Sequence, residues 1–276
     1  MNSRHPSPLL DVSPVALPGS HAGATTRSPA RSPCDEAQLE RAFTLTLDKL
    51  YLAFQPIVSW RERRAVACEV LMRSKEPSLP NPLAVLDAAE RLGRLADLGR
   101  RVRDLAASSL PDIPEDIRLF VNIHPSDITD AELYTADAPL SRVAPRVTLE
   151  VTERAGLGDP GALRLQLARL RELGYRIAID DLGAGYAGLT SLALLGPEVV
   201  KLDMSLVRHV DTNPTTARII SSMVDLCRDM GVALVSEGVE TRAERDRLVG
   251  LGVDLLQGYY FARPTPILTQ PAPETL

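Results

Sequence analysis

Residues 147–181, VTLEVTERAGLGDPGALRLQLARLRELGYRIAIDD, have the pattern of a strand, a helix and a second strand. Each strand is a short apolar run that ends in carboxylates, at Glu150 in the first and at Asp180 and Asp181 in the second. The helical segment between them stops at Gly174, a residue type favoured just past the C-terminus of a helix. A unit of this kind predicts neighbouring parallel strands in an α/β protein.

The same pattern extends in both directions from this stretch. Seven apolar runs end in a carboxylate, an amide or a lysine: ACEV at Glu69, LFVN at Asn122, VTLE at Glu150, IAIDD at Asp180 and Asp181, VVKLD at Lys201, LVSEG at Glu237 and LLQG at Gln257. From residue 122 onward the runs alternate with helical segments, two of which end in Gly231 and Gly252. Barrels of α/β type place catalytic groups at the carboxyl ends of their strands. The regularity favours a closed barrel, although the sequence leaves an open sheet as an alternative.

The N-terminal part of the chain has a different composition. Residues 1–35 are rich in Ser, Pro and Ala without helical or strand periodicity, which predicts a disordered tail. A helix is expected from residue 35 to 50, followed by a strand over 51–59, a turn at 60–64 and a second strand over 65–73. Because that connection is short, the first two strands should pair antiparallel. Helical periodicity follows over 81–110, and we expect one folded barrel over residues 36–270.

Composition excludes several classes of function. The net charge of −5 gives no reason to expect binding to a nucleic-acid polymer. The three cysteines are few and widely spaced, which fits a reducing compartment. No apolar run approaches the roughly eighteen residues of a membrane-spanning helix. We therefore expect a cytoplasmic protein with no membrane insertion.

The strand-terminal acids have a chemical consequence if they converge. The carboxylates are those of Glu69, Glu150, Asp180, Asp181 and Glu237. Each like-charged pair at about 4 Å and an effective dielectric constant near 20 costs roughly 4 kcal/mol, so the acids must be protonated or bind cations. Oxygen ligands, with the amides Asn122 and Gln257 completing the set, suit Mg²⁺ or Mn²⁺ better than zinc. The adjacent Asp180 and Asp181 suit two ions, an arrangement used to hydrolyse phosphodiesters.

Structural explanations compete with several of these assignments. A single strand-terminal aspartate is often a helix cap or a turn residue, and Glu153 has an equally simple reading as a capping residue. His124 shares a strand face with Asn122 but is expected to be a hydrogen-bonded structural histidine. Cys68 should point away from the acids by strand alternation. The glycine-rich segment DLGAGYAGL, residues 181–189, lacks a dinucleotide or Walker spacing and is expected to form a mobile loop over the site.

These motifs together resemble the EAL-domain cyclic di-GMP phosphodiesterases, over residues 51–264. FQPIV at 54–58 is similar to the opening strand of that family, and Glu69-Val70-Leu71 stands at the place of the signature Glu-Ala-Leu, with Arg73 just after it. VNIHP, LEVTE, IAIDDLGAGYAGL, VKLD, SEGVET and QGYYFARP follow in the order of the family. The resemblance implies a (β/α)8 barrel of the TIM type with an antiparallel first strand pair.

The resemblance also implies a role for each matching residue. It makes Glu69, Asn122, Glu150 and Asp180 ligands of a first metal ion, and Asp180, Asp181 and Glu237 ligands of a second, with Gln257 close by. The catalytic residues would be Lys201, Glu237, Glu153 and Asp181, and Lys201 would hold the attacking water. Substrate contacts would be Gln55, Arg73 and Asp203. Glu153 and Glu240 would support the active-site loop, and Glu240 also the contact between the two copies of a homodimer.

Two departures from the family pattern bear on activity. Val70 replaces the signature alanine beside a metal ligand, and the loop has Leu182 and Ala187-Gly188 where Phe and Ser-Ser are commoner. The expected function is hydrolysis of cyclic di-GMP to linear pGpG with two Mg²⁺ or Mn²⁺ ions, in bacterial second-messenger signalling. The alternatives are a catalytically silent cyclic di-GMP receptor that signals through a regulatory partner protein, and an unrelated metal-dependent barrel acting on enolates.

Overall fold

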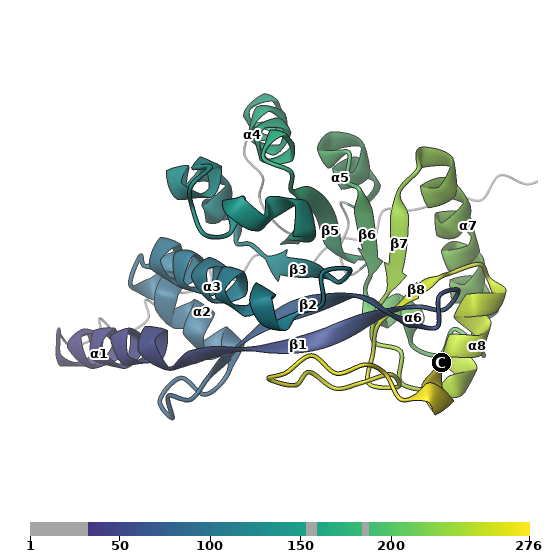
Figure 1. The fold of residues 1–276 in the computed structure, drawn as a ribbon, viewed down its shortest axis with the longest axis horizontal. Helices are drawn as coiled ribbons and strands as arrows, with labels where there is room; N and C mark the ends of the chain where they lie inside the picture. The colour runs from purple at the N-terminus through teal and green to yellow at the C-terminus, as the bar shows by residue number, and fades with distance from the viewer. Residues whose placement is uncertain (1–32, 153–158, 184–187) are drawn as a thin grey trace, which may run out of the picture.

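The computed structural model describes residues 33–152, 159–183 and 188–276, and the side chains of residues 33, 34, 188 and 189 are not described. Eight strands form a closed barrel in sequence order, which confirms the predicted barrel over the open sheet (Figure 1). The strands are β1 (Leu50–Ser59), β2 (Arg64–Ser74), β3 (Arg118–Asn122), β4 (Val147–Thr152), β5 (Arg176–Leu182), β6 (Val199–Leu202), β7 (Ala233–Ser236) and β8 (Leu255–Leu256).

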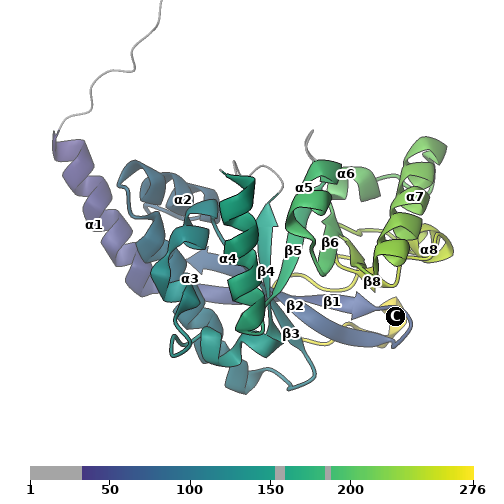
Figure 2. The same ribbon diagram turned by 90° about the horizontal axis from the view of Figure 1, so that it is seen from above.

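Helices cover the outside of the barrel (Figures 1 and 2). They are α1 (Pro33–Lys49), α2 (Pro82–Arg91), α3 (Leu95–Ser109), α4 (Pro160–Glu172), α5 (Gly188–Leu195), α6 (Met204–Val207), α7 (Pro214–Met230) and α8 (Arg242–Gly250). Short 3₁₀ helices are η1 (Leu110–Asp112), η2 (Pro125–Thr129), η3 (Ala131–Tyr134), η4 (Ser141–Arg146) and η5 (Pro273–Thr275). Within the described ranges, no helix has the length and apolar character needed to cross a membrane.

The direction of β1 sets this barrel apart from an all-parallel one. β1 pairs antiparallel with both β2 and β8, while the pairs from β2 to β8 are parallel. The tight turn after β1 is closed by Arg63 in the left-handed region at φ 56, whose N–H donates to the Ser59 carbonyl at 2.9 Å. The predicted antiparallel hairpin is therefore confirmed.

Strand alternation divides the apolar side chains between two sides of the barrel wall. The interior is filled by Ile57, Ala67, Phe120, Ala178, Val199 and Val235. The opposite faces of the strands pack against the helices, and Cys68 and Val70 belong to that outer core. Cys68 thus points away from the acids as predicted, and burial raises the pKa of its thiol to about 12. Val70, the departure from the signature, is likewise an outer-core residue.

Some predicted elements have different bounds. The last run, residues 254–261, contributes only Leu255–Leu256 to the sheet, because the chain turns at Gly258, whose carbonyl accepts from the Phe261 N–H. Residues 188–189 of the glycine-rich segment begin helix α5 and are not loop. Residues 181–182 of that segment belong to β5, and residues 33–35 of the predicted tail belong to α1, so both predictions were wrong at these positions. Residues 184–187, residues 1–32 of the tail and Glu153 lie outside the described residues. Gly174, Gly231 and Gly252 all have positive φ just after helices, as the sequence predicted.

Candidate metal centre

Neighbouring strands bring the predicted acids and amides to one end of the barrel. The register pairs Gln55 with Glu69 between β1 and β2, and Asn122 with Glu150 between β3 and β4. Glu69 lies two residues beyond Ala67, one of the side chains that fill the interior, so alternation also turns Glu69 inward. The polar side chains therefore form a layer directly above the apolar filling of the barrel.

Lys201 lies at the centre of this layer and is fully buried. Its Nζ lies 2.5 Å from Glu150 Oε1, 3.1 Å from Asp180 Oδ1 and 3.3 Å from Glu69 Oε2. It also forms an ion pair with Glu237 Oε1. One ammonium thus contacts four carboxylates that come from β2, β4, β5 and the residue after β7, which confirms that these residues converge.

Amide side chains orient Glu69 from two sides. Asn122 Nδ2 donates to Glu69 Oε1 at 2.9 Å, and Gln257 Nε2 donates to Glu69 Oε2 at 2.8 Å. Gln257 Nε2 also lies 3.3 Å from Gln55 Oε1, and Gln55 Nε2 donates to the Ala262 carbonyl at 3.1 Å. Gln257 thus donates to two neighbours, while its own Oε1 is buried and accepts no hydrogen bond among the described residues, which leaves this oxygen for a ligand.

A bulge in β5 brings Asp181 to the same place as Asp180. In a regular strand, consecutive side chains point to opposite faces. The pairing of β5 with β6 is irregular between Ile179 and Leu182, and Asp181 has φ 56 in the left-handed region. Such bulges occur next to active sites, where they re-aim a side chain. One oxygen each of Asp180, Asp181 and Glu237 lies within 4.8 Å of the others.

The buried charges shift one another's pKa values. Burial raises the pKa of Glu150 well above its ordinary value, with Lys201 opposing this and the neighbouring acids adding to it. Burial likewise raises the pKa of Glu237 to about 8. For Glu69, burial is outweighed by Lys201 and the two amide donors, so its pKa is lowered. Burial acts to lower the pKa of Lys201, but the four acids raise it well above its ordinary value, so the lysine stays an ammonium.

Without metal ions, Glu237 is expected to make the protein less stable as the pH rises. Its folded-state pKa lies above its ordinary value, so its contribution is greatest below about pH 4.5 and is lost as the pH passes through about 8. In EDTA, the difference between the Tm of a Glu237→Gln variant and that of the wild type should therefore shift in favour of the variant as the pH rises from about 5 to 8. Glu76→Gln is the control, because the hydrogen bond from Lys49 lowers the pKa of Glu76. If the difference in Tm between Glu237→Gln and the wild type were constant over this pH range, the raised pKa of Glu237 would be contradicted.

The donor atoms fit divalent cations. Gln257 Oε1 and Glu150 Oε2 are buried and have no hydrogen-bond partner among the described residues. Two sets of three carboxylates have oxygens within 4.8 Å of one another, and Glu237 belongs to both: Glu69, Glu150 and Glu237, and Asp180, Asp181 and Glu237. Ligand sets made only of oxygen suit hard cations of the Mg²⁺ and Mn²⁺ type. Among the described residues Glu237 is the one common to both sets, whereas the family resemblance implies Asp180 as the shared ligand.

The predicted substrate contacts lie around two cavities at this end of the barrel. A cavity of about 260 Å³ is lined by Gln55, Asp203 and Glu240 together with Glu69, Asp181, Glu237 and Gln257. Asp203 also caps α6, since its Oδ1 accepts from the Ser205 N–H at 2.9 Å. Glu240 is exposed and pairs with Arg208 at 2.8 Å.

The second cavity, of about 290 Å³, is an apolar recess that the sequence did not predict. It is lined by Arg73 and its neighbours on β2, by side chains of α2 and α3, by Asn122 and the turn after it as far as Asp127, and by Thr152. The helical periodicity over 81–110 indicated those helices but not that their faces leave a recess. His124 also lines it, and its Nδ1 lies 2.7 Å from Ser126 Oγ, so His124 is the predicted hydrogen-bonded histidine.

Comparison with known proteins gives consistent results. The family described as EAL domain matches residues 36–264. The chain is 34% identical over 222 residues to the probable cyclic di-GMP phosphodiesterase PdeG of Escherichia coli, covering 76% of this chain and 44% of PdeG. It is 38% identical over 161 residues to the cyclic di-GMP phosphodiesterase RocR of Pseudomonas aeruginosa, covering 57% of this chain and 41% of RocR. The chain thus spans less than half the length of either relative.

A solved structure supports the same comparison. The Klebsiella pneumoniae protein BlrP1, in complex with manganese and cyclic di-GMP, superimposes with a TM-score of 0.73 at 31% identity, covering 81% of this chain and 58% of BlrP1. BlrP1 in complex with calcium and the same nucleotide gives a TM-score of 0.68 at 33% identity, covering 79% and 56%. The acidic cluster described above lies within residues 36–264, which the EAL domain family matches.

Proposed function

The chain belongs to the EAL domain family, and we propose that it is a metal-dependent phosphodiesterase that hydrolyses cyclic di-GMP to linear pGpG. The observation that carries this proposal is the cluster of carboxylates around Lys201, in which two overlapping sets of acids share Glu237. A cyclic dinucleotide has two phosphodiesters, and its negative charge would be repelled by this acidic mouth unless cations were bound there.

We assign the metal ligands as follows. Glu69, Asn122, Glu150 and Asp180 would hold one Mg²⁺ or Mn²⁺ ion, and Asp180, Asp181 and Glu237 would hold the second, with Gln257 beside them. When bound, two such ions supply positive charge for the attacking and leaving oxygens of an in-line displacement. The amide hydrogen bonds to Glu69 support this assignment, because ligating carboxylates are commonly oriented by such neighbours.

The residues of the chain have separate tasks in the reaction. Lys201 would hold the attacking water by donating a hydrogen bond to it. The water would attack phosphorus as the bond to the ribose 3′-oxygen breaks, and its proton would pass through a neighbouring carboxylate to that leaving oxygen, which departs as a hydroxyl. Arg73 lines the 290 Å³ cavity and its Nη1 donates to the Met72 carbonyl at 2.8 Å, and its remaining guanidinium N–H groups would contact a substrate phosphate. Gln55 and Asp203 would contact the nucleotide from the 260 Å³ cavity.

Purified protein with Mg²⁺ or Mn²⁺ is expected to convert cyclic di-GMP to pGpG. The conversion is measured by separating the nucleotides in samples taken at successive times. Calcium should bind but support little hydrolysis, because its looser coordination positions water poorly. Nucleotide binding without product at several metal concentrations would instead establish the silent receptor. Equal rates with calcium and magnesium would contradict the assigned metal chemistry.

Other properties remain predictions. We propose that the folded unit extends over residues 36–270, that two copies form a homodimer with Glu240 near the contact, and that Glu153 anchors the loop over the site. The cytoplasmic location and a regulatory partner protein also remain predictions from the sequence.

A further inference from the structure

A buried ion-pair network lies directly behind the turn that follows Asn122. Arg103 on α3 is 5% exposed, and its Nη1 lies 2.8 Å from Asp127 Oδ1 while its Nη2 lies 2.5 Å from Asp130 Oδ2. Both aspartates are buried, and Arg100 also pairs with Asp130. Asp127 also lines the 290 Å³ cavity, but none of these charged groups belongs to the acidic layer around Lys201, so the network calls for an explanation of its own.

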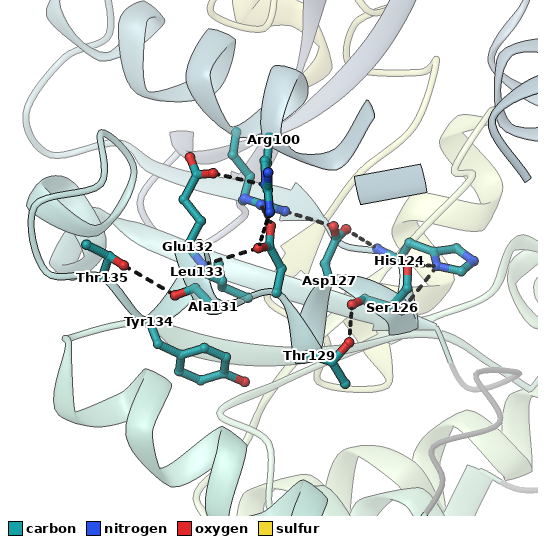
Figure 3. Close-up of polar contacts among 12 residues, drawn as sticks. Arg100, His124, Ser126, Asp127, Thr129, Ala131, Glu132, Leu133, Tyr134 and Thr135 are labelled. Carbon is teal, nitrogen blue, oxygen red and sulfur yellow. Dashed lines mark hydrogen bonds and ion pairs between the residues drawn. The ribbon is translucent and has the colours of Figure 1, made fainter. Parts of the chain in front are cut away.

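Asp127 connects this network to the backbone that leaves β3. Its Oδ2 accepts from the His124 N–H at 2.8 Å, and its own N–H donates to the His124 carbonyl at 2.8 Å (Figure 3). The preceding N–H, that of Ile123, donates to the Glu150 carbonyl at 3.0 Å. The two peptide groups that follow Asn122 are therefore fixed, one by β4 and one by Asp127.

Gly99 allows Asp127 to lie against α3. A Cβ atom added at Gly99 would be 2.1 Å from Asp127 Oδ1, so any larger residue would displace the carboxylate. Asp130 does not have this arrangement: it shares Arg103 with Asp127, but its other contacts are Arg100 and the Glu132 N–H. Of the two aspartates, only Asp127 accepts the hydrogen bond from the His124 N–H that reaches the turn after Asn122.

We propose that Asp127, held by Arg103 against Gly99, is a positioning residue that sets the orientation of Asn122 and thereby the affinity of the site for a divalent cation. The proposal rests on the proposed function, in which Asn122 is a metal ligand. Asn122 is exposed at the end of β3, and its side chain has only the hydrogen bond to Glu69 to orient it among the described contacts. Rigid backbone on its C-terminal side is therefore what keeps its carbonyl oxygen directed at the cation.

Asp127→Ala and Asp130→Ala form a matched pair that tests this proposal. Each leaves Arg103 with one carboxylate, so both should lower the Tm by similar amounts. The affinity for Mn²⁺, measured by calorimetry in the absence of nucleotide, should fall at least about tenfold for Asp127→Ala, as for other residues that orient metal ligands. For Asp130→Ala it should change less than about threefold. The Mn²⁺ concentration for half-maximal hydrolysis should shift in the same way.

A second pair tests the same idea without removing a charge. Gly99→Ala should weaken Mn²⁺ binding as Asp127→Ala does, whereas Gly250→Ala, in helix α8 with no atom within 4 Å of the added Cβ, should not. If Asp127→Ala does not fold, this pair decides the question. Wild-type affinity in both Asp127→Ala and Gly99→Ala would overturn the positioning role while leaving the phosphodiesterase intact. Wild-type protein that binds no Mn²⁺ would overturn the proposed function itself.

Discussion

Lys201→Met is expected to abolish turnover and to make the metal-free protein markedly less stable. The ammonium contacts Glu69, Glu150, Asp180 and Glu237, and each would lose its only buried cationic partner among the described residues. Breaking a buried ion pair by removing one partner typically costs about 3–5 kcal/mol. Loss of the donor that holds the water should lower kcat by at least about a hundredfold, as for one preorganised electrostatic group.

Metal ions should reverse the stability loss but not the loss of turnover. Cations bound by the carboxylates replace the missing positive charge, so the gap in Tm between Lys201→Met and wild type should be large in EDTA and small in Mn²⁺. Lys49→Met is the control, because Lys49 pairs with Glu76 at 2.7 Å but is 44% exposed, and such pairs contribute at most about 1 kcal/mol. If the Lys201→Met variant were as stable as the wild type in EDTA, the lysine would not be what neutralises the charge of the four carboxylates.

Strand periodicity is sufficient to predict much of this site. Glu69, Glu150 and Lys201 each end or nearly end an apolar run, and parallel strands in sequence order bring such positions to one rim. The hairpin of β1 and β2 follows from the short turn between them. These features depend on local pattern and on topology, both of which are present in the sequence.

Other parts of the site depend on geometry that no local pattern encodes. Asp181 reaches the cluster only because β5 bulges and its φ is positive, whereas simple alternation would turn it away from Asp180. The contact of Asp127 with Gly99 joins a helix to a distant turn, and neither residue stands out by its sequence neighbours. The short β8 and the start of α5 inside the glycine-rich segment likewise depend on packing.

Asp180→Asn is expected to lower kcat by at least about a hundredfold, with little effect on the fold. Asp180 lies in the acidic layer between Lys201, which is 3.1 Å from its Oδ1, and the carboxylates of Asp181 and Glu237. The amide keeps the size of the side chain and one oxygen but removes a negative charge that a pair of divalent cations requires. The loss matches that of one preorganised electrostatic element.

Metal titration distinguishes this effect from general damage to the protein. Removing one of the acids around Lys201 lowers the repulsion among those that remain, so Asp180→Asn should be at least as stable as wild type in EDTA while binding Mn²⁺ more weakly. Asp116→Asn is the control, since Asp116 is an exposed partner of Arg64 far from the acids in the barrel register. Full turnover in Asp180→Asn, at Mn²⁺ concentrations that saturate the wild type, would remove Asp180 from the metal centre. The two-ion assignment depends on this residue, because the sequence resemblance makes it the ligand common to both ions.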